Sequence, residues 1–295
     1  MKLHKYAAID IGSNGVRLLI SNVIEFKKKE TQFKKSSLVR VPIRLGADVF
    51  TTGKVSKNNE KRICDAMQAF QLLMKVHGVE KYKACATSAM REAKNGSEIA
   101  DCVFKKTGVK IDIIDGKTEA EIISSTDLNQ LIEGDKSYLY VDVGGGSTEF
   151  TFFSEGKIIA SKSFPLGTVR LLDNKVNKEV WDDAKDWIKE NSKDLPKLSL
   201  IGSGGNINKI FKMSGKLPGK PLSDVYLTSY YNFLNQMTYD ERISELDLNP
   251  DRADVIIPAS KIYIKAMKWS GAKKMYVPKI GLSDGIIKSL YLGKL

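Results

Sequence analysis

Two stretches of the sequence share one layout: YAAIDIGSNGVRLLISNV at residues 6–23 and YLYVDVGGGSTEFTFFSEG at residues 138–156. Each reads as an apolar strand, an aspartate, an apolar residue, a glycine with small neighbours, and a second strand. Two strands joined by such a short turn predict a β-hairpin. The repetition predicts two similarly folded halves that face each other across a cleft. We place the first domain at residues 1–128 and the second at residues 129–295.

The segments that follow the first hairpin alternate between helix and strand. A third strand is expected at residues 37–46 (SLVRVPIRLG), and a half-buried strand at residues 109–115, where apolar and polar residues alternate. Ser56 can cap a helix that carries its apolar residues on one face and ends at Gly78. A strand meander followed by alternating helices and strands is typical of α/β proteins.

The second half of the chain predicts further helices, around residues 180–188, after Gly204 and from Pro250 towards Trp269. Pro250 suits the first turn of a helix. Pro258 should kink that helix, because a proline inside a helix clashes with the preceding turn. A helix at the C-terminus can pack back on the first domain.

The composition is that of a soluble folded protein, with 42% hydrophobic and 28% charged residues. No stretch approaches the roughly 20 apolar residues that span a bilayer, and the N-terminus lacks the apolar run of a signal peptide. Three widely spaced cysteines without a CxxC pattern indicate neither a disulfide framework nor a zinc site. We therefore expect a cytoplasmic protein with no membrane partner.

The net charge and the histidine content limit which ligands and which catalytic groups are expected. The net charge of +12 favours polyanions, whether nucleic acid, acidic membrane or a phosphorylated small molecule. The densest basic run, at residues 27–35, lies between two strand patterns and is interpreted as a solvated hairpin tip, so nucleic acid is not expected. His4 and His77 are the only histidines. Catalysis is therefore expected to use carboxylates, cations, hydroxyls, backbone amides or a hard metal ion.

Three glycine-rich turns follow apolar strands: IDIGSNG at residues 9–15, VDVGGGST at 141–148 and LIGSGGN at 200–206. Glycine has no side chain to block the approach of backbone amides to an oxyanion. None of the turns fits the common phosphate-loop or dinucleotide patterns, and one such turn alone is more often a structural tight turn. Three together favour phosphate binding, with Gly204 and Gly205 as candidates in the third.

Carboxylates accompany the first two turns. Asp10 and Asp142 end apolar strands, where an unpaired carboxylate is costly to bury. Such hard oxygen ligands suit Mg²⁺, whereas capping of the turn amides is the structural alternative. Glu149, on the strand that leaves the second turn, could join the same metal or orient a water molecule.

Arg91 and a pair of glutamates are further candidates. Arg91 stands in TSAMREA, where a loop meets a helix, so its guanidinium could hold phosphate oxygens or form a helix salt bridge. Glu119 and Glu121 are two residues apart on an expected helix and therefore face different directions. Glu119 shares a side with the apolar Ile122 and Ile123, which makes it the better candidate for a general base.

Seven segments follow one another in a specific order: DIGSNGVRLLI, ATSAMREA, GKTEAEII, DVGGGSTEF, PLGTVRLLD, IGSGGN and RADVIIPA. Together they resemble the exopolyphosphatase and guanosine pentaphosphate phosphatase family, over nearly the whole chain. That family belongs to the superfamily of sugar kinases, actin and the heat-shock ATPases. The resemblance implies an α/β fold of two actin-like (ribonuclease H-like) domains with a cleft between them.

The resemblance also implies which residues bind phosphate. In the family, phosphate contacts come from the first turn, which corresponds to Ser13 and Asn14, and from an arginine that corresponds to Arg91. The second turn contributes the residues that match Gly144, Gly145, Gly146, Ser147 and Thr148.

Metal and catalytic roles follow in the same way. The acidic residues that match Asp142 and Glu149 are associated with Mg²⁺ and the attacking water. With Asp10, which is a candidate because it ends an apolar strand, they form the expected site for Mg²⁺ or Mn²⁺. The catalytic glutamate of the family corresponds to Glu119, which gives Glu119 and Glu149 as the catalytic candidates.

Two segments depart from the family pattern. The usual Gly-x-Glu-Glu-Ala-Arg becomes GKTEAE at residues 116–121, so Thr118 and Glu121 differ. The usual C-terminal Gly-Leu-Arg-Glu-Gly becomes GLSDG at residues 281–285, which puts Ser283 where a cation is expected.

The leading expectation is an Mg²⁺-dependent hydrolase that releases terminal phosphate from inorganic polyphosphate. Short chains are expected, because the resemblance is to a short form without extra C-terminal helical domains. The alternatives are a guanosine pentaphosphate 5′-phosphohydrolase and a low-turnover sensor that binds polyphosphate or nucleotides. The expected partners are accordingly polyphosphate or a phosphorylated guanosine nucleotide, with a homodimer as a further possibility.

Overall fold

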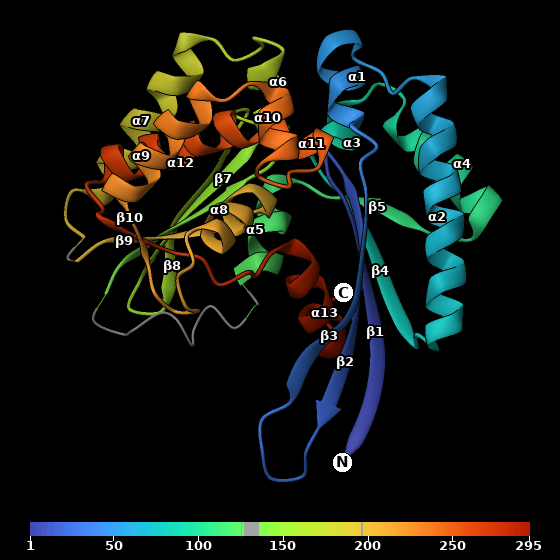
Figure 1. Ribbon diagram of the computed structural model, residues 1–295. Helices are drawn as coiled ribbons and strands as arrows, with labels where there is room; N and C mark the ends of the chain where they lie inside the picture. The colour runs from blue at the N-terminus through green and yellow to red at the C-terminus, as the bar shows by residue number, and fades with distance from the viewer. Residues whose placement is uncertain (125, 127–135, 196) are drawn as a thin grey trace. The chain divides into compact units, whose positions relative to one another are not determined.

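The computed structural model of the chain describes residues 1–124, 126, 136–195 and 197–295 (Figure 1). The chain divides into two compact units, each with its own sheet and core. The first comprises Met1–Thr126 together with Gly281–Leu295, and the second comprises Asp127–Ile280. The boundary predicted between residues 128 and 129 lies outside the described residues.

In the described part of the first unit, five strands form one mixed sheet in the order β3-β2-β1-β4-β5. The first three strands form an antiparallel meander, and β4 and β5 continue the sheet in parallel on the other side of β1. The strands are β1 (Lys2–Ile11), β2 (Val16–Glu25), β3 (Gln32–Val41), β4 (Lys81–Ala86) and β5 (Ile111–Ile113).

The third strand differs from its prediction. It begins at Gln32 rather than at residue 37 and ends at Val41, because the chain then turns into a helix from Leu45. Lys34 and Lys35 belong to this edge strand and pair with β2. Charged residues are common on edge strands, where they discourage further strand pairing. Because the start of this strand is charged, the hydrophobic pattern did not reveal it.

The helices of the first unit cover both faces of its sheet. Ala7, Ile9 and Leu18 share a core with Ile63 and Phe70 of α2. Ala8 and Leu19 point to the opposite face and are equally buried, and there α13 packs on β1, β2 and β4. The helices are α1 (Leu45–Thr52), α2 (Lys57–His77), α3 (Ser88–Glu92), α4 (Gly96–Thr107), α5 (Gly116–Ser124) and α13 (Leu282–Tyr291).

Helix α2 confirms both of its predicted ends. The Ser56 hydroxyl accepts a hydrogen bond from the backbone N–H of Asn59, at 3.2 Å, and this caps the first turn. Gly78 ends the helix in the left-handed conformation, with φ of 67°.

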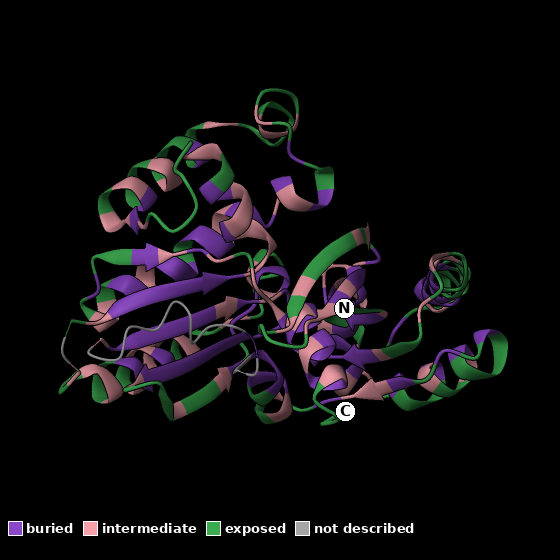
Figure 2. Ribbon diagram, turned by 90° about the horizontal axis from the view of Figure 1, so that it is seen from below, coloured by how far each residue is buried: buried purple, intermediate pink, exposed green. Residues whose placement is uncertain are grey.

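In the described part of the second unit, six strands form a sheet in the order β10-β11-β9-β6-β7-β8. The strands β6, β7 and β8 again form an antiparallel meander, and β9 and β11 continue it in parallel from β6. Both sheets therefore have the same core topology and buried central strands (Figure 2). This topology confirms the predicted fold class, two actin-like α/β units. The strands are β6 (Tyr138–Val143), β7 (Thr148–Ser154), β8 (Lys157–Phe164), β9 (Ser199–Ser203), β10 (Leu222–Ser223) and β11 (Lys274–Tyr276).

The helix predicted from Pro250 towards Trp269 is divided in two. Pro250 starts α11, as expected, but a new helix begins at Ile256. Pro258 therefore lies in the first turn of α12, where its missing N–H has no helical partner, and the prediction that it kinks a longer helix was wrong. The helices of this unit are α6 (Thr168–Leu172), α7 (Lys178–Ser192), α8 (Gly205–Met213), α9 (Asp224–Gln236), α10 (Tyr239–Ser244), α11 (Pro250–Ala253) and α12 (Ile256–Ser270).

Helix α12 is the centre of the second unit. It packs on α7, α8, α9 and β6, and Ile262, Tyr263 and Ala266 on it are fully buried. In the described part of the chain, no helix combines the length and the apolar character needed to cross a membrane.

Candidate functional site

The two predicted hairpins have matching geometry. In the first, Asp10 lies directly opposite Arg17, and the turn closes with a 3.2 Å hydrogen bond from Gly12 N–H to the Gly15 carbonyl. In the second, Asp142 lies directly opposite Glu149, and Gly144 N–H donates to the Ser147 carbonyl at 2.9 Å. The duplication seen in the sequence is therefore a structural repeat, in which one unit places a cation where the other places a carboxylate.

Asp10 is buried and paired. Its Oδ2 atom lies 3.2 Å from Nη1 of Arg17, so the carboxylate already has a cationic partner. Burial raises the pKa of Asp10, and the charges of Arg17 and Arg40 oppose this rise. A metal ion at this position would therefore share the carboxylate with Arg17.

The first turn is joined to two other segments of its unit. The Ser13 hydroxyl lies 2.9 Å from the Ser88 hydroxyl at the start of α3. The backbone carbonyls of Ser13 and Asn14 accept hydrogen bonds from Gly46 at 2.8 Å and Arg44 at 3.1 Å. Arg44 has a left-handed backbone with φ of 61°, which is uncommon for a residue with a side chain. Sequence reasoning missed the approach of this loop.

Arg91 ends α3 and extends towards the start of α5. Its Nη1 atom donates to the Ile114 carbonyl at 2.7 Å, so the guanidinium is anchored by backbone. The neighbouring Asp115 carboxylate accepts from Thr118 N–H at 2.7 Å. That hydrogen bond lowers the pKa of Asp115, and the charge of Arg91 adds to the effect.

The two glutamates of α5 have different environments. Glu119 is buried, with 8% of its surface exposed, whereas Glu121 is exposed and lies 4.0 Å from Lys117. This difference is what their spacing of two residues predicts. Helix α13 covers α5 closely, since a Cβ atom at Gly285 would lie 2.3 Å from the Ile122 carbonyl. Glycine is therefore required at that contact.

The residues of α13 that depart from the family pattern have structural roles. Ser283 is buried. Asp284 accepts from Gly281 N–H at 3.1 Å, which caps the helix, and its other oxygen lies 2.8 Å from Lys35 Nζ. The shorter acidic side chain is thus used to fix the start of α13 on the β3 edge.

Glu149 is a closely held carboxylate of the second unit. It is 4% exposed, and its Oε1 atom accepts from the Ser147 hydroxyl at 2.6 Å and the Ser163 hydroxyl at 2.9 Å. Ser163 is on β8, directly opposite Glu149. Two hydroxyl donors on one oxygen fix the orientation of the carboxylate. Sequence reasoning did not find Ser163.

Helix α6 holds the second glycine turn from behind. The carbonyls of Gly144 and Gly145 accept from the N–H groups of Thr168 and Val169, at 3.0 and 2.8 Å. The Gly146 carbonyl accepts from Nε of Arg170 at 2.6 Å. With all three carbonyls engaged by α6, the conformation of the turn depends on that helix.

The third glycine turn lies beside Asp142. A Cβ atom at Gly204, where φ is 114°, would lie 3.5 Å from Oδ1 of Asp142 and 3.2 Å from the Tyr263 hydroxyl. Tyr263 donates to the Ser203 carbonyl, and Arg252 donates to the Gly205 carbonyl. The structure therefore brings together Asp142, Glu149 and the second and third turns within the second unit.

These groups fit the chemistry expected of a magnesium site. Among the described residues, no cluster of three or more Asp, Glu, His or Cys side chains could hold a metal ion. Asp142 and Glu149 nevertheless form a cross-strand carboxylate pair. Mg²⁺ is commonly bound by one or two carboxylates, with water and substrate phosphate completing its shell, so the pair is compatible with that ion.

Comparison with known proteins identifies the family. Residues 24–293 match the Ppx/GppA phosphatase family. The chain belongs to this family. The predicted enzyme class, a phosphoanhydride hydrolase, is confirmed at the level of this phosphatase family.

Individual relatives are similar over different spans. The chain is 31% identical to a bifunctional 3-dehydroquinate synthase/phosphatase of Fusobacterium nucleatum, covering 90% of this chain but only 43% of that protein. It is 25% identical to Exopolyphosphatase 2 of Mycobacterium tuberculosis, covering 98% of this chain and 99% of that one.

Solved structures show the same fold. The Ppx/GppA family member of Aquifex aeolicus has a TM-score of 0.78 and 24% identity, with 99% of both chains covered. An exopolyphosphatase of Cytophaga hutchinsonii has a TM-score of 0.84 and 21% identity, with 98% of both chains covered. At these identities the likeness concerns the fold.

Proposed function

We propose that this Ppx/GppA protein is an Mg²⁺-dependent exopolyphosphatase that releases the terminal phosphate of short inorganic polyphosphate. The main observation in support is the environment of Glu149, which is buried and oriented by two hydroxyl groups. Glu149 lies opposite Asp142 and next to a glycine turn whose carbonyls are held by hydrogen bonds. The name of the mycobacterial relative, which matches over almost the full length of both chains, supports the polyphosphate substrate. The net charge of +12 suits a polyanion.

In this proposal the two turns of the second unit bind the terminal phosphate. The side chains of Ser147 and Thr148 and the backbone of Gly144–Gly146 and Gly204-Gly205 would contact its oxygens. Asp142 and Glu149 would hold Mg²⁺, with Asp10 as a further candidate from the first unit. When bound, the ion would neutralise negative charge on the phosphate.

Glu119 is assigned the proton transfer. Its carboxylate takes a proton from water as the water oxygen attacks the terminal phosphorus and the bond to the bridging oxygen breaks. Arg91, Ser13 and Asn14 are assigned phosphate contacts from the first unit. The cleft predicted from the sequence remains a prediction, and the joint action of both units depends on it.

Two alternatives keep part of this chemistry. A guanosine pentaphosphate 5′-phosphohydrolase would use the same groups on a nucleotide. A low-turnover sensor of polyphosphate or nucleotides is favoured by the buried Ser283, which leaves the position of a family cation uncharged.

Phosphate release separates these functions. The purified chain is supplied with short polyphosphate, long polyphosphate, guanosine pentaphosphate or ATP, with Mg²⁺ or with EDTA. We expect the fastest release from short polyphosphate, and loss of release in EDTA. Faster release from guanosine pentaphosphate would favour the phosphohydrolase. Tight binding without release from any substrate would favour the sensor.

A further inference from the structure

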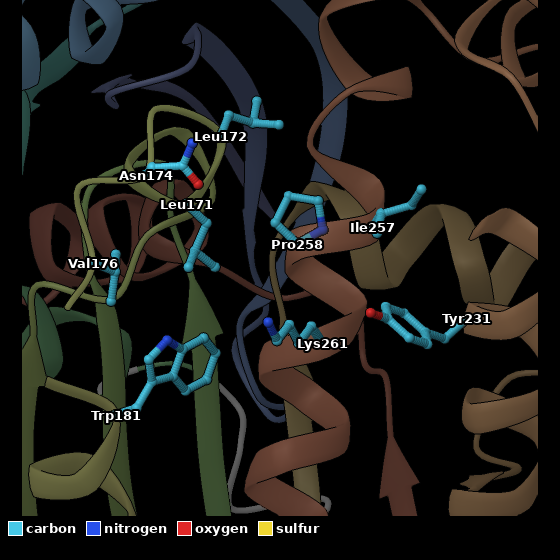
Figure 3. Close-up of a pocket in the computed structure, with 9 residues that line it drawn as sticks. All are labelled: Leu171, Leu172, Asn174, Val176, Trp181, Tyr231, Ile257, Pro258 and Lys261. Atoms are coloured by element: carbon cyan, nitrogen blue, oxygen red, sulfur yellow. The ribbon is translucent and has the colours of Figure 1, made fainter. Parts of the chain in front are cut away.

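A pocket of about 350 Å³ lies in the second unit, apart from the residues assigned above (Figure 3). It is formed by the end of α6 and the loop that follows, by the first turn of α7, by the first two turns of α12, and by Tyr231 of α9. A volume of this size is at the lower end of the range for small-molecule sites. Every lining residue belongs to one unit, so the pocket does not depend on how the units are arranged.

The apolar part of the pocket has a flat wall. Trp181 provides that wall, with Leu171 and Val176 beside it and Pro258 across from it (Figure 3). The Trp181 ring makes an edge contact with Trp269, with centroids 5.9 Å apart and an interplanar angle of 72°, which limits its freedom. A fixed indole beside aliphatic side chains favours a flat ring as the ligand.

The polar part of the pocket carries a positive charge. Among the described residues that line it, Lys261 is the one with a charged side chain, and its Nζ atom lies 5.5 Å from the centre of the Trp181 ring. Asn174 and Tyr231 add an amide and a hydroxyl. Asn174, two residues after the end of α6, adopts φ of 52°, a conformation that asparagine tolerates better than most residues. A cation without a lining carboxylate favours an anionic group on the ligand.

Two of the helices that line the pocket, α6 and α12, also hold the glycine turns. Leu171 and Leu172, at the end of α6, line the pocket, whereas Thr168, Val169 and Arg170 in the same helix bind the carbonyls of the second turn. A displacement of α6 therefore alters the backbone that orients Gly144–Gly146.

The second helix repeats this arrangement. Lys261 on α12 lines the pocket, and Tyr263, two residues later, binds the carbonyl of Ser203 beside the third turn. The pocket thus shares a helix with each turn: α6 with the second turn and α12 with the third.

We propose that this pocket is an effector site for a small molecule that carries a flat ring and one anionic group, such as a carboxylate, sulfonate or phosphate. The ring packs against Trp181, and the anion pairs with Lys261. Occupancy changes the conformation of the second glycine turn through α6. The effect on turnover rests on the proposed function, whereas binding and the response of the turn do not.

The test uses 8-anilinonaphthalene-1-sulfonate, a fluorescent probe with aromatic rings and one sulfonate. We expect saturable binding of one probe per chain. Lys261→Gln should raise Kd about three- to tenfold, because an ion pair near the surface is lost. Trp181→Leu should raise Kd about tenfold through loss of ring contact. Lys268→Gln, which removes an exposed cation of α12 that does not line the pocket, should leave Kd unchanged.

Hydrogen exchange of residues 144–148 gives a readout that needs no activity. Saturating probe should change the exchange rate in this turn in the natural chain and in Lys268→Gln, and should change it much less in Trp181→Leu at the same concentration. Thermal unfolding checks that the variants are folded. Several weak binding events per chain, an unchanged Kd in folded Lys261→Gln, or unaltered exchange at saturation would overturn the proposal. Failure of phosphate release with single-site binding intact would instead overturn the proposed function.

Discussion

Asp142 and Glu149 lie directly opposite each other on β6 and β7, whereas the same positions of the first hairpin hold Asp10 and Arg17. The two units thus use one backbone frame with different charges. In the first unit Arg17 neutralises the aspartate within the protein. In the second, a carboxylate takes the place of Arg17, so two acidic residues face each other, and the proposed metal site is centred there.

The assignment of the base is tested with Glu119→Gln. This change keeps size and most hydrogen bonding but removes proton acceptance, so turnover should fall about 10²–10⁴-fold with little change in KM. Glu121→Gln is the matched control, because Glu121 is exposed on the same helix. Equal losses in the two variants would show that the wrong carboxylate has been assigned.

The orientation of Glu149 is tested with Ser163→Ala. Loss of the 2.9 Å hydrogen bond to Oε1 leaves Ser147 as the hydroxyl donor described on that atom, and turnover should fall about tenfold. Ser161→Ala is the control, since Ser161 is on the same strand but bonds Thr151 instead. A Ser163 variant with normal turnover would mean that Ser163 does not position the carboxylate.

Residues whose structure depends on nearby sequence could be predicted, and α2 illustrates this. Its cap and its terminating glycine both act within one turn of the helix ends. The hairpins were found for the same reason, since strand, aspartate and glycine are consecutive. Helix periodicity placed Glu119 and Glu121 on different sides, and the apolar Ile122 and Ile123 beside Glu119 indicated which of the two is buried.

Residues that depend on register or packing between elements were missed. Ser163 faces Glu149 because a two-residue turn at Glu155 and Gly156, with φ of 52° and 75°, starts the pairing of β7 with β8, and a bulge at Phe152 and Phe153 then shifts the register by one residue. The contact of Arg91 with the Ile114 carbonyl spans 23 residues, so no local pattern reveals it. The positions of the third turn beside Asp142 and of Ser88 beside Ser13 likewise arise from strand order.

Asp10 gives a prediction about pH. Because burial raises its pKa above the ordinary value of 3.8, the folded state binds a proton more readily than the unfolded state. Ionised Asp10 therefore lowers stability at neutral pH, and this cost disappears as pH falls through the raised pKa towards 3.8. Asp10→Asn should be more stable than the natural chain at pH 7, with a difference that shrinks on acidification.

Urea unfolding at a series of pH values measures that difference. Asp115→Asn is the opposite control, because a hydrogen bond from Thr118 lowers the pKa of Asp115. The ionised Asp115 carboxylate of the natural chain stabilises the fold above pH 3.8, and this contribution is lost as pH falls through the lowered pKa. An Asp10→Asn variant that is less stable than the natural chain at pH 7 would show that the ion pair with Arg17 outweighs burial.

Tyr263 of α12 binds the backbone beside the third glycine turn through its hydroxyl group, and Tyr263→Phe removes this hydrogen bond alone. Burial raises the pKa of its hydroxyl, and the negative charge of Asp142 raises it further, so the group remains a neutral donor to the Ser203 carbonyl. Removing it leaves a buried carbonyl without that donor, which should cost about 1–3 kcal/mol in the free energy of unfolding. Gly204, beside both Tyr263 and Asp142, should then lose its fixed position. We expect kcat to fall in a variant that is still folded at the assay temperature.

Tyr230→Phe serves as the control, because the Tyr230 hydroxyl contacts Met213 rather than a turn. If Tyr263→Phe lowers the unfolding free energy but leaves both kcat and KM unchanged, Tyr263 stabilises α12 without positioning the site.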